Sequence, residues 1–128
     1  MKLLLDTATF IWLLEDAPEL SSAARTAIAD MDNDVYLSAA SAWEIAVKYG
    51  RGRLQLPRPP EELVREQREA RGFIPLPIDE ASALRVHHLP ALHADPFDRI
   101  LACQAIEHAM TVVTPDALLR AYPIRTIW

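Results

Sequence analysis

The sequence predicts an α/β domain in which helices cover both faces of a central, mainly parallel sheet of about four to five strands, a three-layer α/β/α arrangement. Short apolar runs typical of buried strands alternate with segments that carry apolar residues at helical spacing, and turn or cap residues separate them. This alternation favours a parallel sheet with two covered faces, because parallel strands need crossover helices that pack on the sheet. Such sheets bind ligands beyond the carboxyl ends of their strands.

In the first half of the chain, each strand is a short apolar run. Asp6-Thr7 forms an acidic turn before the first helix, and serine residues can cap the second and third helices. Gly50 ends the third helix, because glycine readily adopts the backbone conformation that terminates helices. We expect a strand at residues 2–5, helices at 10–14 and 22–29, a strand at 35–37 and a helix at 38–49.

Prolines and cap residues divide the second half of the chain. Residues 54–60 are proline-rich and extended, and we interpret them as a connector within one domain because apolar residues flank them. Pro75 places the third strand nearer an edge of the sheet, since proline cannot donate a hydrogen bond. We expect an exposed helix at 60–71, a strand at 73–76, helices at 81–86 and 96–110, a buried strand at 111–113, a helix start at 114–116 and a strand at 124–127.

The helix that begins at Asp95-Pro96 raises a question of charge. Asp95 is a good N-cap, and proline suits the first helical position. The residues that follow are mostly apolar, so the helix should be buried on most of its circumference. Asp98 lies on the inward, apolar face of this helix, where burying a carboxylate is costly unless a cation or hydrogen-bond donors compensate.

Composition limits the classes of protein that need to be considered. The length of 128 residues suits a single domain, residues 1–128. Thirteen Lys and Arg against eighteen Asp and Glu give a net charge of −5, which argues against binding nucleic acid by bulk positive charge. The apolar runs are too short to span a bilayer and no signal-peptide pattern is present, so we expect a cytoplasmic protein without membrane contact. The single cysteine, Cys103, should lie in the core.

Four acidic residues follow strands or lie in the first turns of helices: Asp6, Glu44, Asp98 and Asp116. Each has an ordinary explanation on its own, as a turn residue, a charge that suits a helix dipole, or, for Glu44, an i+4 partner of Lys48. Carboxylates that converge repel one another, so we expect them to persist together where a divalent cation neutralises them. A set of oxygen ligands favours Mg²⁺ or Mn²⁺ over zinc.

The histidines do not change this metal assignment. His87, His88 and His93 match no zinc-binding spacing, and we interpret His93 as a capping or turn residue. Hard cations held by carboxylates can generate hydroxide and stabilise the leaving oxygen in phosphodiester hydrolysis, so the acids predict a metal-dependent nuclease.

Basic residues near these acids could steer a nucleic-acid backbone toward them: Lys48, Arg51, Arg53 and Arg99. Arg99 could instead form a structural ion pair.

Four blocks of sequence, which contain the four acids in order, resemble the PIN-domain toxins of VapC type. These blocks are Asp6-Thr7 with residues 10–14, residues 38–48 (SAASAWEIAVK), residues 93–99 (HADPFDR), and Thr114-Pro115-Asp116. The resemblance implies a PIN-like fold and an endoribonuclease that depends on Mg²⁺ or Mn²⁺ and acts as the toxin of a bacterial type II toxin–antitoxin pair. It places Asp6, Glu44, Asp98 and Asp116 at the catalytic and metal-binding positions.

The resemblance also implies auxiliary residues and partners. The possible auxiliary residues are Thr7, Asp95, Thr114 and Arg99. The expected partners are a VapB-like antitoxin, an RNA substrate and a second copy of the chain. Many relatives have His two residues after the first Asp, where this chain has Ala8, so substrate contacts there should differ. Residues 12–14 (Trp-Leu-Leu) suit either an apolar partner surface or the core.

Two other functions remain open from the sequence. A receiver-type signalling domain would have paired acids after the first strand and a lysine after the last, but Thr7 follows Asp6 and the only lysines are Lys2 and Lys48. A catalytically silent PIN-like domain that only binds a partner is the second alternative, and the four intact acids count against it.

Overall fold

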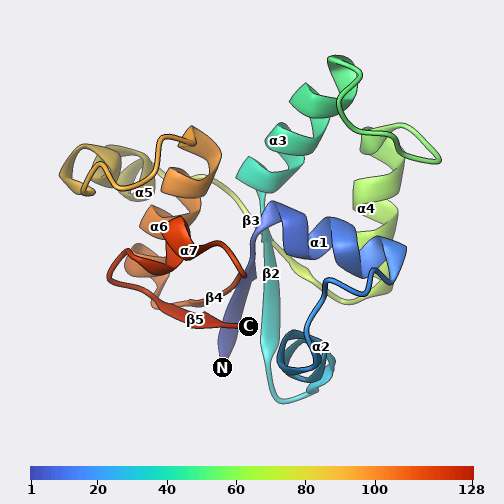
Figure 1. Ribbon diagram of the computed structural model, residues 1–128, viewed down its shortest axis with the longest axis horizontal. Helices are drawn as coiled ribbons and strands as arrows, with labels where there is room; N and C mark the ends of the chain where they lie inside the picture. The colour runs from blue at the N-terminus through green and yellow to red at the C-terminus, as the bar shows by residue number, and fades with distance from the viewer.

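A computed structural model describes residues 1–128 and confirms the predicted α/β fold (Figure 1). The five strands are β1 (Lys2–Leu5), β2 (Asp34–Ser38), β3 (Ile74–Leu76), β4 (Thr111–Val113) and β5 (Arg125–Ile127). The helices are α1 (Thr7–Glu15), α2 (Ser22–Ala29), α3 (Ala39–Gly50), α4 (Pro60–Ala70), α5 (Glu80–Arg85), the 3-10 helix η1 (Val86–His88), α6 (Pro96–His108) and α7 (Ala117–Arg120).

The sheet has the order β3-β2-β1-β4-β5, and every neighbouring pair of strands is parallel. β3 lies at an edge, as Pro75 predicts. From β1 the chain first builds outward to β3 and then returns to place β4 on the other side of β1. This reversal between β1 and β4 is the switch point at which open α/β sheets bind ligands.

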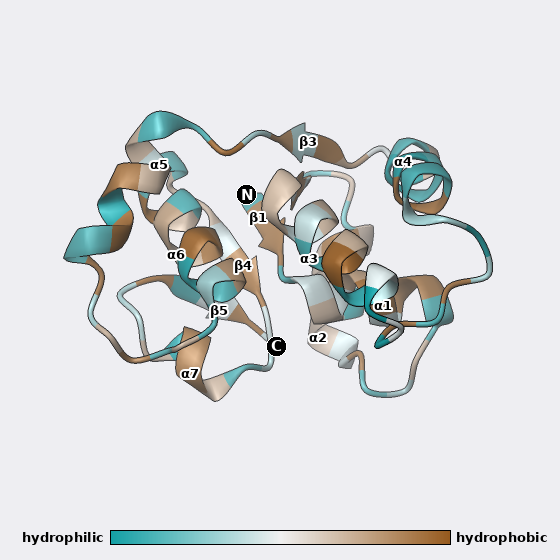
Figure 2. Cartoon of the chain, turned by 90° about the horizontal axis from the view of Figure 1, so that it is seen from above, coloured by the Kyte–Doolittle hydropathy of each residue, from teal (hydrophilic) through white to brown (hydrophobic).

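The two faces of the sheet carry separate apolar cores, and strand pleating distributes the side chains between them. In β1, Leu3 and Leu5 belong to one core and Leu4 to the other. Helices α1 to α4 gather on one side of the sheet and α5 to α7 on the other (Figure 1). Hydrophobic colours cover much of β1 and β4 (Figure 2), as expected for strands buried on both faces.

Helix α6 is the most deeply buried helix, in agreement with its apolar sequence. Every residue from Ile100 to Ala105 is buried, including Cys103. Gln104 is fully buried, and its amide is satisfied at both ends: Oε1 accepts a hydrogen bond from the Ser38 hydroxyl at 2.6 Å, and Nε2 donates to the Pro77 carbonyl at 3.1 Å. These bonds fix α6 against the carboxyl ends of β2 and β3.

The first helix begins earlier than the sequence predicts. α1 starts at Thr7 because Asp6 serves as its N-cap, so the acid after β1 is a cap as well as a turn residue. Trp12, Leu13 and Leu14 are half-buried and pack at the margin of the core, and the Trp12 ring lies 5.8 Å from that of Trp128. None of the helices has the length and apolar character needed to cross a membrane.

The central position of β1 predicts a large effect of truncating its core side chain. Leu4 is completely buried, so Leu4→Ala should lower the free energy of unfolding by about 2–5 kcal/mol through lost burial and a residual cavity. Urea denaturation of the metal-free protein measures this loss. Leu84→Ala, at a position that is 64% exposed, should change it by less than about 0.5 kcal/mol. Equal effects at the two leucines would contradict the assignment of β1 to the core.

Candidate metal centre

Asp6 places a buried carboxyl group at the carboxyl end of β1. Its Oδ1 accepts a hydrogen bond from the Thr9 N–H at 2.7 Å, and its Oδ2 accepts one from the Thr114 hydroxyl. Burial raises the pKa of Asp6, although the hydrogen bonds from Thr114 and Thr9 act in the opposite direction. Neutral donors therefore hold this carboxyl group in place without cancelling its charge.

The neighbouring strand β4 contributes Thr114 and Asp116. The Thr114 hydroxyl accepts from the Asp116 N–H at 3.0 Å, so it links the end of β4 to Asp6 on β1. Asp116 is the N-cap of α7, and its Oδ1 accepts from the Leu118 N–H at 2.8 Å. Burial raises the pKa of Asp116, but hydrogen bonds, chiefly from His93, outweigh that effect and hold the pKa below its usual range.

Asp98 lies in the first turn of α6, and its charged form is the least favoured among the four acids. Its side chain is only 16% exposed. Burial is the largest cause that raises the pKa of Asp98 to about 7, and the nearby negative charges of Asp95 and Glu44 add to it. The sequence-based expectation that burial of this carboxylate is costly is therefore met in the structure.

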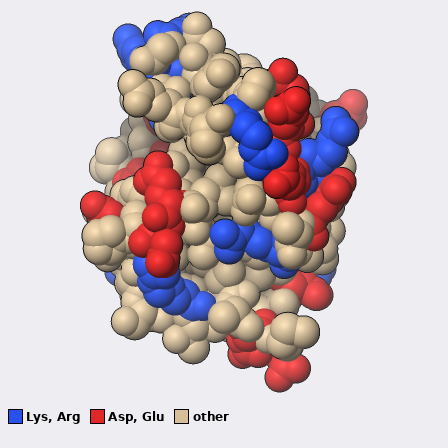
Figure 3. Space-filling model, turned by 90° about the vertical axis from the view of Figure 1, so that its right-hand side faces the viewer, with Lys and Arg blue, Asp and Glu red and all other residues tan.

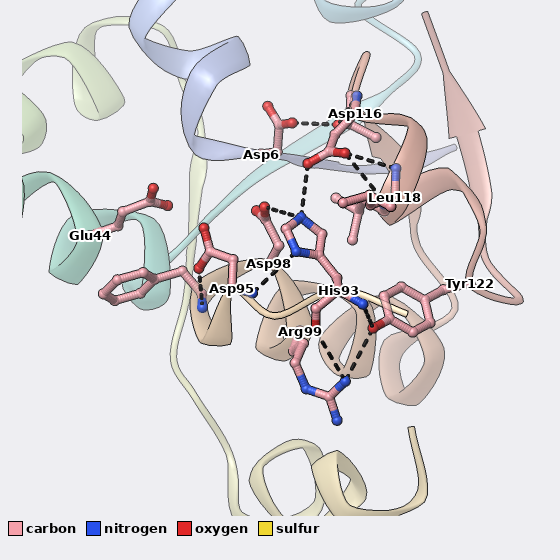
Figure 4. Close-up of polar contacts among 12 residues, drawn as sticks. Asp6, Glu44, His93, Asp95, Asp98, Arg99, Asp116, Leu118 and Tyr122 are labelled. Atoms are coloured by element: carbon pink, nitrogen blue, oxygen red, sulfur yellow. Dashed lines mark hydrogen bonds and ion pairs between the residues drawn. The ribbon is translucent and has the colours of Figure 1, made fainter. Parts of the chain in front are cut away.

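Glu44 comes from α3, on the other side of the sheet (Figure 4). Its charge acts on Asp98, and we call the region where these four acids converge (Figure 4) the acidic pocket. Glu44 is 5% exposed, and its Oε2 pairs with Lys48 Nζ one turn later, as the i+4 spacing predicts. Its Oε1 is buried and has no hydrogen-bond partner. An unpartnered buried carboxylate oxygen is unfavourable, and a bound cation would satisfy it, so the residues present fit a divalent ion.

His93 is a member of the pocket that the sequence did not reveal. The expected turn role is present, because its Nδ1 accepts from the Asp95 N–H at 3.1 Å. In addition, its Nε2 lies 3.0 Å from both Asp98 Oδ2 and Asp116 Oδ2. Burial lowers the pKa of His93, but these carboxylates and Asp95 outweigh burial and raise the pKa above its usual range.

The tightest cluster of possible ligands is thus His93, Asp98 and Asp116, whose ligand atoms all lie within 4.8 Å of one another. Asp6 and Glu44 lie outside this tight cluster but contribute charges that raise the pKa of Asp98 (Figure 4). The structure therefore brings the four predicted acids to one pocket, two of them in close contact through an unpredicted histidine.

Arg99 has a role that neither sequence-based interpretation described. Its guanidinium forms no ion pair, because it donates to backbone carbonyls of the segment before α6 and to the Tyr122 hydroxyl (Figure 4). The carbonyl acceptors, at 3.0–3.4 Å, belong to Val86, Leu89, Pro90 and His93. Arg99 is therefore positioned to fix the loop that carries His93.

Two other predicted auxiliary residues have structural contacts. Asp95 caps α6, with its Oδ1 accepting from the Phe97 N–H at 2.9 Å. The Thr7 hydroxyl donates to the Ser41 hydroxyl at 3.0 Å, which joins α1 to α3. Between α3 and α6, the Trp43 ring packs edge-on against Phe97 with centroids 4.7 Å apart, beside the helical turns that carry Glu44 and Asp98.

The predicted basic residues differ in their partners and exposure. Lys48 is engaged with Glu44, whereas Arg51 and Arg53 are exposed beyond the end of α3. On the face formed by α1 to α4, basic and acidic side chains are interspersed (Figure 3), and Arg58 there pairs with Glu66. The mixture of charges on this face (Figure 3) agrees with the net charge of −5.

Comparison with known families identifies the fold around this pocket. The model of the PIN domain family matches residues 3–124. The chain belongs to the PIN domain family. Membership in this family excludes the receiver-domain alternative.

Individual relatives agree with this assignment. The PIN domain described here is 42% identical over 57 residues to Ribonuclease VapC16 of Mycobacterium tuberculosis (strain ATCC 25618 / H37Rv), a stretch that covers 44% of this chain and 40% of that protein. Among solved structures, it resembles VapBC2 from Rickettsia felis bound to a fragment of promoter DNA, with a TM-score of 0.72, 13% identity, and coverage of 98% of this chain and 97% of the other. It also resembles FitAcB from Neisseria gonorrhoeae, with a TM-score of 0.65, 24% identity, and coverage of 97% and 95%.

The raised pKa of Asp98 predicts how the stability of the metal-free PIN domain depends on pH. The folded state binds the Asp98 proton more tightly than the unfolded chain, whose Asp pKa is about 4. The stabilising contribution of this proton is therefore fully present below pH 4 and is lost as the pH rises through 7. In EDTA, Asp98→Asn should have a higher Tm than wild type at pH 8, and the difference should shrink toward pH 4.

Thermal unfolding from pH 4 to pH 8.5 measures this difference. Asp32→Asn, at an exposed turn remote from the pocket, serves as the control and should show no comparable pH-dependent difference. A wild type that is more stable than Asp98→Asn at pH 8 in EDTA would show that the carboxylates are compensated without a cation.

Proposed function

We propose that this chain is an endoribonuclease that depends on Mg²⁺ or Mn²⁺ and acts as the toxin of a bacterial type II toxin–antitoxin pair. The observation that carries the proposal is the pocket at the carboxyl edge of the sheet, where four carboxyl groups converge and Glu44 Oε1 is buried without a partner. The likeness of part of the chain to a protein named as a ribonuclease supports RNA as the substrate.

In this proposal, Asp98, Asp116, Asp6 and Glu44 hold the cation. A divalent ion bound there supplies charge neutralisation and an acidified water for phosphodiester hydrolysis. The protein's own contribution is to fix these oxygens before substrate arrives, through the hydrogen bonds of Thr9 and Thr114 to Asp6 and of the α7 backbone to Asp116. Preorganised oxygens do not have to be reoriented during the reaction, which lowers its barrier.

The proposal includes a basic partner that covers the acidic pocket. The solved structures that resemble this chain include VapBC and FitAB assemblies, some of them bound to DNA. A VapB-like antitoxin with a cationic side chain would be attracted by the uncompensated carboxylates and by the net charge of −5. We further propose a homodimer of this chain within a toxin–antitoxin hetero-oligomer, and a cytoplasmic location.

The purified chain should cleave single-stranded RNA in Mg²⁺ or Mn²⁺ and stop when EDTA is added. Asp98→Asn should reduce kcat/KM by about 100-fold or more, because it removes one of the negative charges that would hold the cation. Gel analysis of a labelled RNA measures the rate, and Asp32→Asn is the matched control. Equal rates for wild type and Asp98→Asn, or rates that do not depend on metal, would falsify the assignment.

Induction in bacteria separates a toxin from a general nuclease. Expression of the wild-type chain alone should arrest growth, whereas coexpression with the neighbouring small reading frame should relieve the arrest. Asp98→Asn should be tolerated without the second protein, because an inactive toxin does no harm. Growth curves measure the effect at protein levels matched by immunoblot. Unimpaired growth with wild-type protein would exclude the toxin function even if the purified chain cleaves RNA.

A further inference from the structure

We propose that His93 is a positioning residue that donates Nε2–H to Asp116, keeps the same nitrogen beside Asp98, and does not itself bind the metal ion, although it belongs to the tightest cluster of possible ligands. This inference rests on the proposed function, since it concerns the same metal centre. Its evidence is the hydrogen bonding around the ring, which assigns a different task to each of the two nitrogens.

The position of His93 is determined by contacts that involve no metal. Its backbone N–H donates to the Tyr122 hydroxyl at 2.9 Å, and Tyr122 is itself buried. The same hydroxyl accepts a hydrogen bond from Arg99 at 3.2 Å. Arg99 also donates to the His93 carbonyl at 3.4 Å and to the carbonyls of Leu89 and Pro90. The loop is thus anchored to α6, and its anchors leave the imidazole directed into the acidic pocket (Figure 4).

The backbone of Asp95 selects the tautomer of the ring. The Asp95 N–H donates to His93 Nδ1 at 3.1 Å, so Nδ1 must present a lone pair. A neutral imidazole carries one proton, which then resides on Nε2. A nitrogen that binds a metal must be unprotonated. Binding through Nε2 would move the proton to Nδ1, where it would oppose the Asp95 N–H and leave that donor without its acceptor.

The Nε2–H instead joins two carboxylates that come from different elements. The Nε2 atom is hydrogen-bonded to Asp116 Oδ2 at the start of α7 at 3.0 Å and lies 3.0 Å from Asp98 Oδ2 on α6. Without a donor between them, these two like charges would repel and separate. The histidine holds them at one place, and Asp116 Oδ1 is occupied by the N–H groups of Leu118 and Leu119.

Two carboxylate oxygens of the four acids have no partner within the protein and are the most available to a cation. Asp98 Oδ1 receives no hydrogen bond or ion pair, and neither does the buried Glu44 Oε1. Both oxygens belong to carboxylates that act on each other electrostatically across the pocket. With His93 Nε2 protonated, the four acids would offer a cation oxygen ligands only, which suits Mg²⁺ and Mn²⁺ rather than Zn²⁺.

Nitrogen NMR of the wild-type protein tests the tautomer directly. Two-bond proton–nitrogen correlations at pH 8.5 should show a protonated Nε2 and an unprotonated Nδ1 for His93, before and after saturation with Mg²⁺. Assignment uses His93→Gln, which removes one of four ring patterns. Transfer of the proton to Nδ1 on addition of Mg²⁺ would show that Nε2 is a ligand and would overturn the proposal.

Metal affinity tests the positioning role by a measurement independent of RNA cleavage. Mn²⁺ binding, followed by the electron paramagnetic resonance of the free ion, should weaken about 10- to 100-fold in His93→Ala, as for other residues that orient metal ligands. His93→Gln keeps an N–H donor and should recover part of the loss. His88→Ala, an exposed histidine of the preceding 3-10 helix, is the matched control and should bind Mn²⁺ as wild type does.

The outcomes separate this inference from the proposed function. Equal Mn²⁺ affinity of wild type and His93→Ala, with circular dichroism showing both folded, overturns the positioning role. A wild type that binds Mn²⁺ with the predicted dependence on His93 but cleaves no RNA supports the inference and contradicts only the nuclease assignment. A wild type that binds no divalent ion overturns both.

Discussion

Mutual repulsion among carboxyl groups at one edge of the sheet is the constraint on which the rest of this structure depends. β1 and β4 are neighbours at the switch point, so the residues that follow them, Asp6 and Thr114 to Asp116, are brought together by the topology itself. α3 and α6 then add Glu44 and Asp98 from opposite sides. The pKa of Asp98 is raised to about 7, first by burial and then by this crowding of like charges. The fold must hold these groups together against their own charge.

The hydrogen bonds that hold the acids come mostly from neutral donors. Asp6 is held by a backbone N–H and the Thr114 hydroxyl, and Asp116 by the N–H groups that begin α7. Arg99, the cation nearest in sequence to Asp98, is committed to backbone carbonyls instead. Neutral donors fix the geometry of a carboxylate while leaving most of its field in place, and this is what a site needs if it is to attract a hard cation. Lys48 is the one lysine or arginine that pairs with a pocket acid, and Glu44 keeps a second oxygen free.

Local sequence patterns explain why helix α6, the buried position of Asp98 and the edge position of β3 could be predicted. Asp95-Pro96 specifies a helix start through its own chemistry, and the apolar residues that follow specify burial, so α6 and the exceptional position of Asp98 were predictable. The edge position of β3 followed from one proline. The start of α1 was missed because a polar residue after a strand is compatible with both a turn and a cap, and only the hydrogen bond from Thr9 decides between them.

The contacts of His93 and Arg99 could not be predicted for a different reason. His93 meets Asp116 across 23 positions of sequence, and no spacing rule connects them. Arg99 contacts backbone carbonyls, which every residue possesses, so its partners carry no sequence signature. Both depend on how the loop before α6 folds back on that helix. The adjacency of His93 to a good cap at Asp95 was the only available signal, and it accounts for the turn role alone.

The two layers of helices contribute different acids to the pocket. A cation bound there would therefore link the two layers, in addition to its part in the chemistry. The Thr114 hydroxyl joins the ends of β1 and β4, and His93 joins α6 to the start of α7. Neither bond reaches Glu44, whose free oxygen comes from α3, on the far side of the sheet from α7. In the proposed site, Glu44 and Asp98 would both help to hold the cation, and their shared attraction to it would connect the two sides. The positive charge of the cation would polarise a phosphodiester. The same charge would also reduce the repulsion among the carboxylates, which the metal-free fold has to withstand.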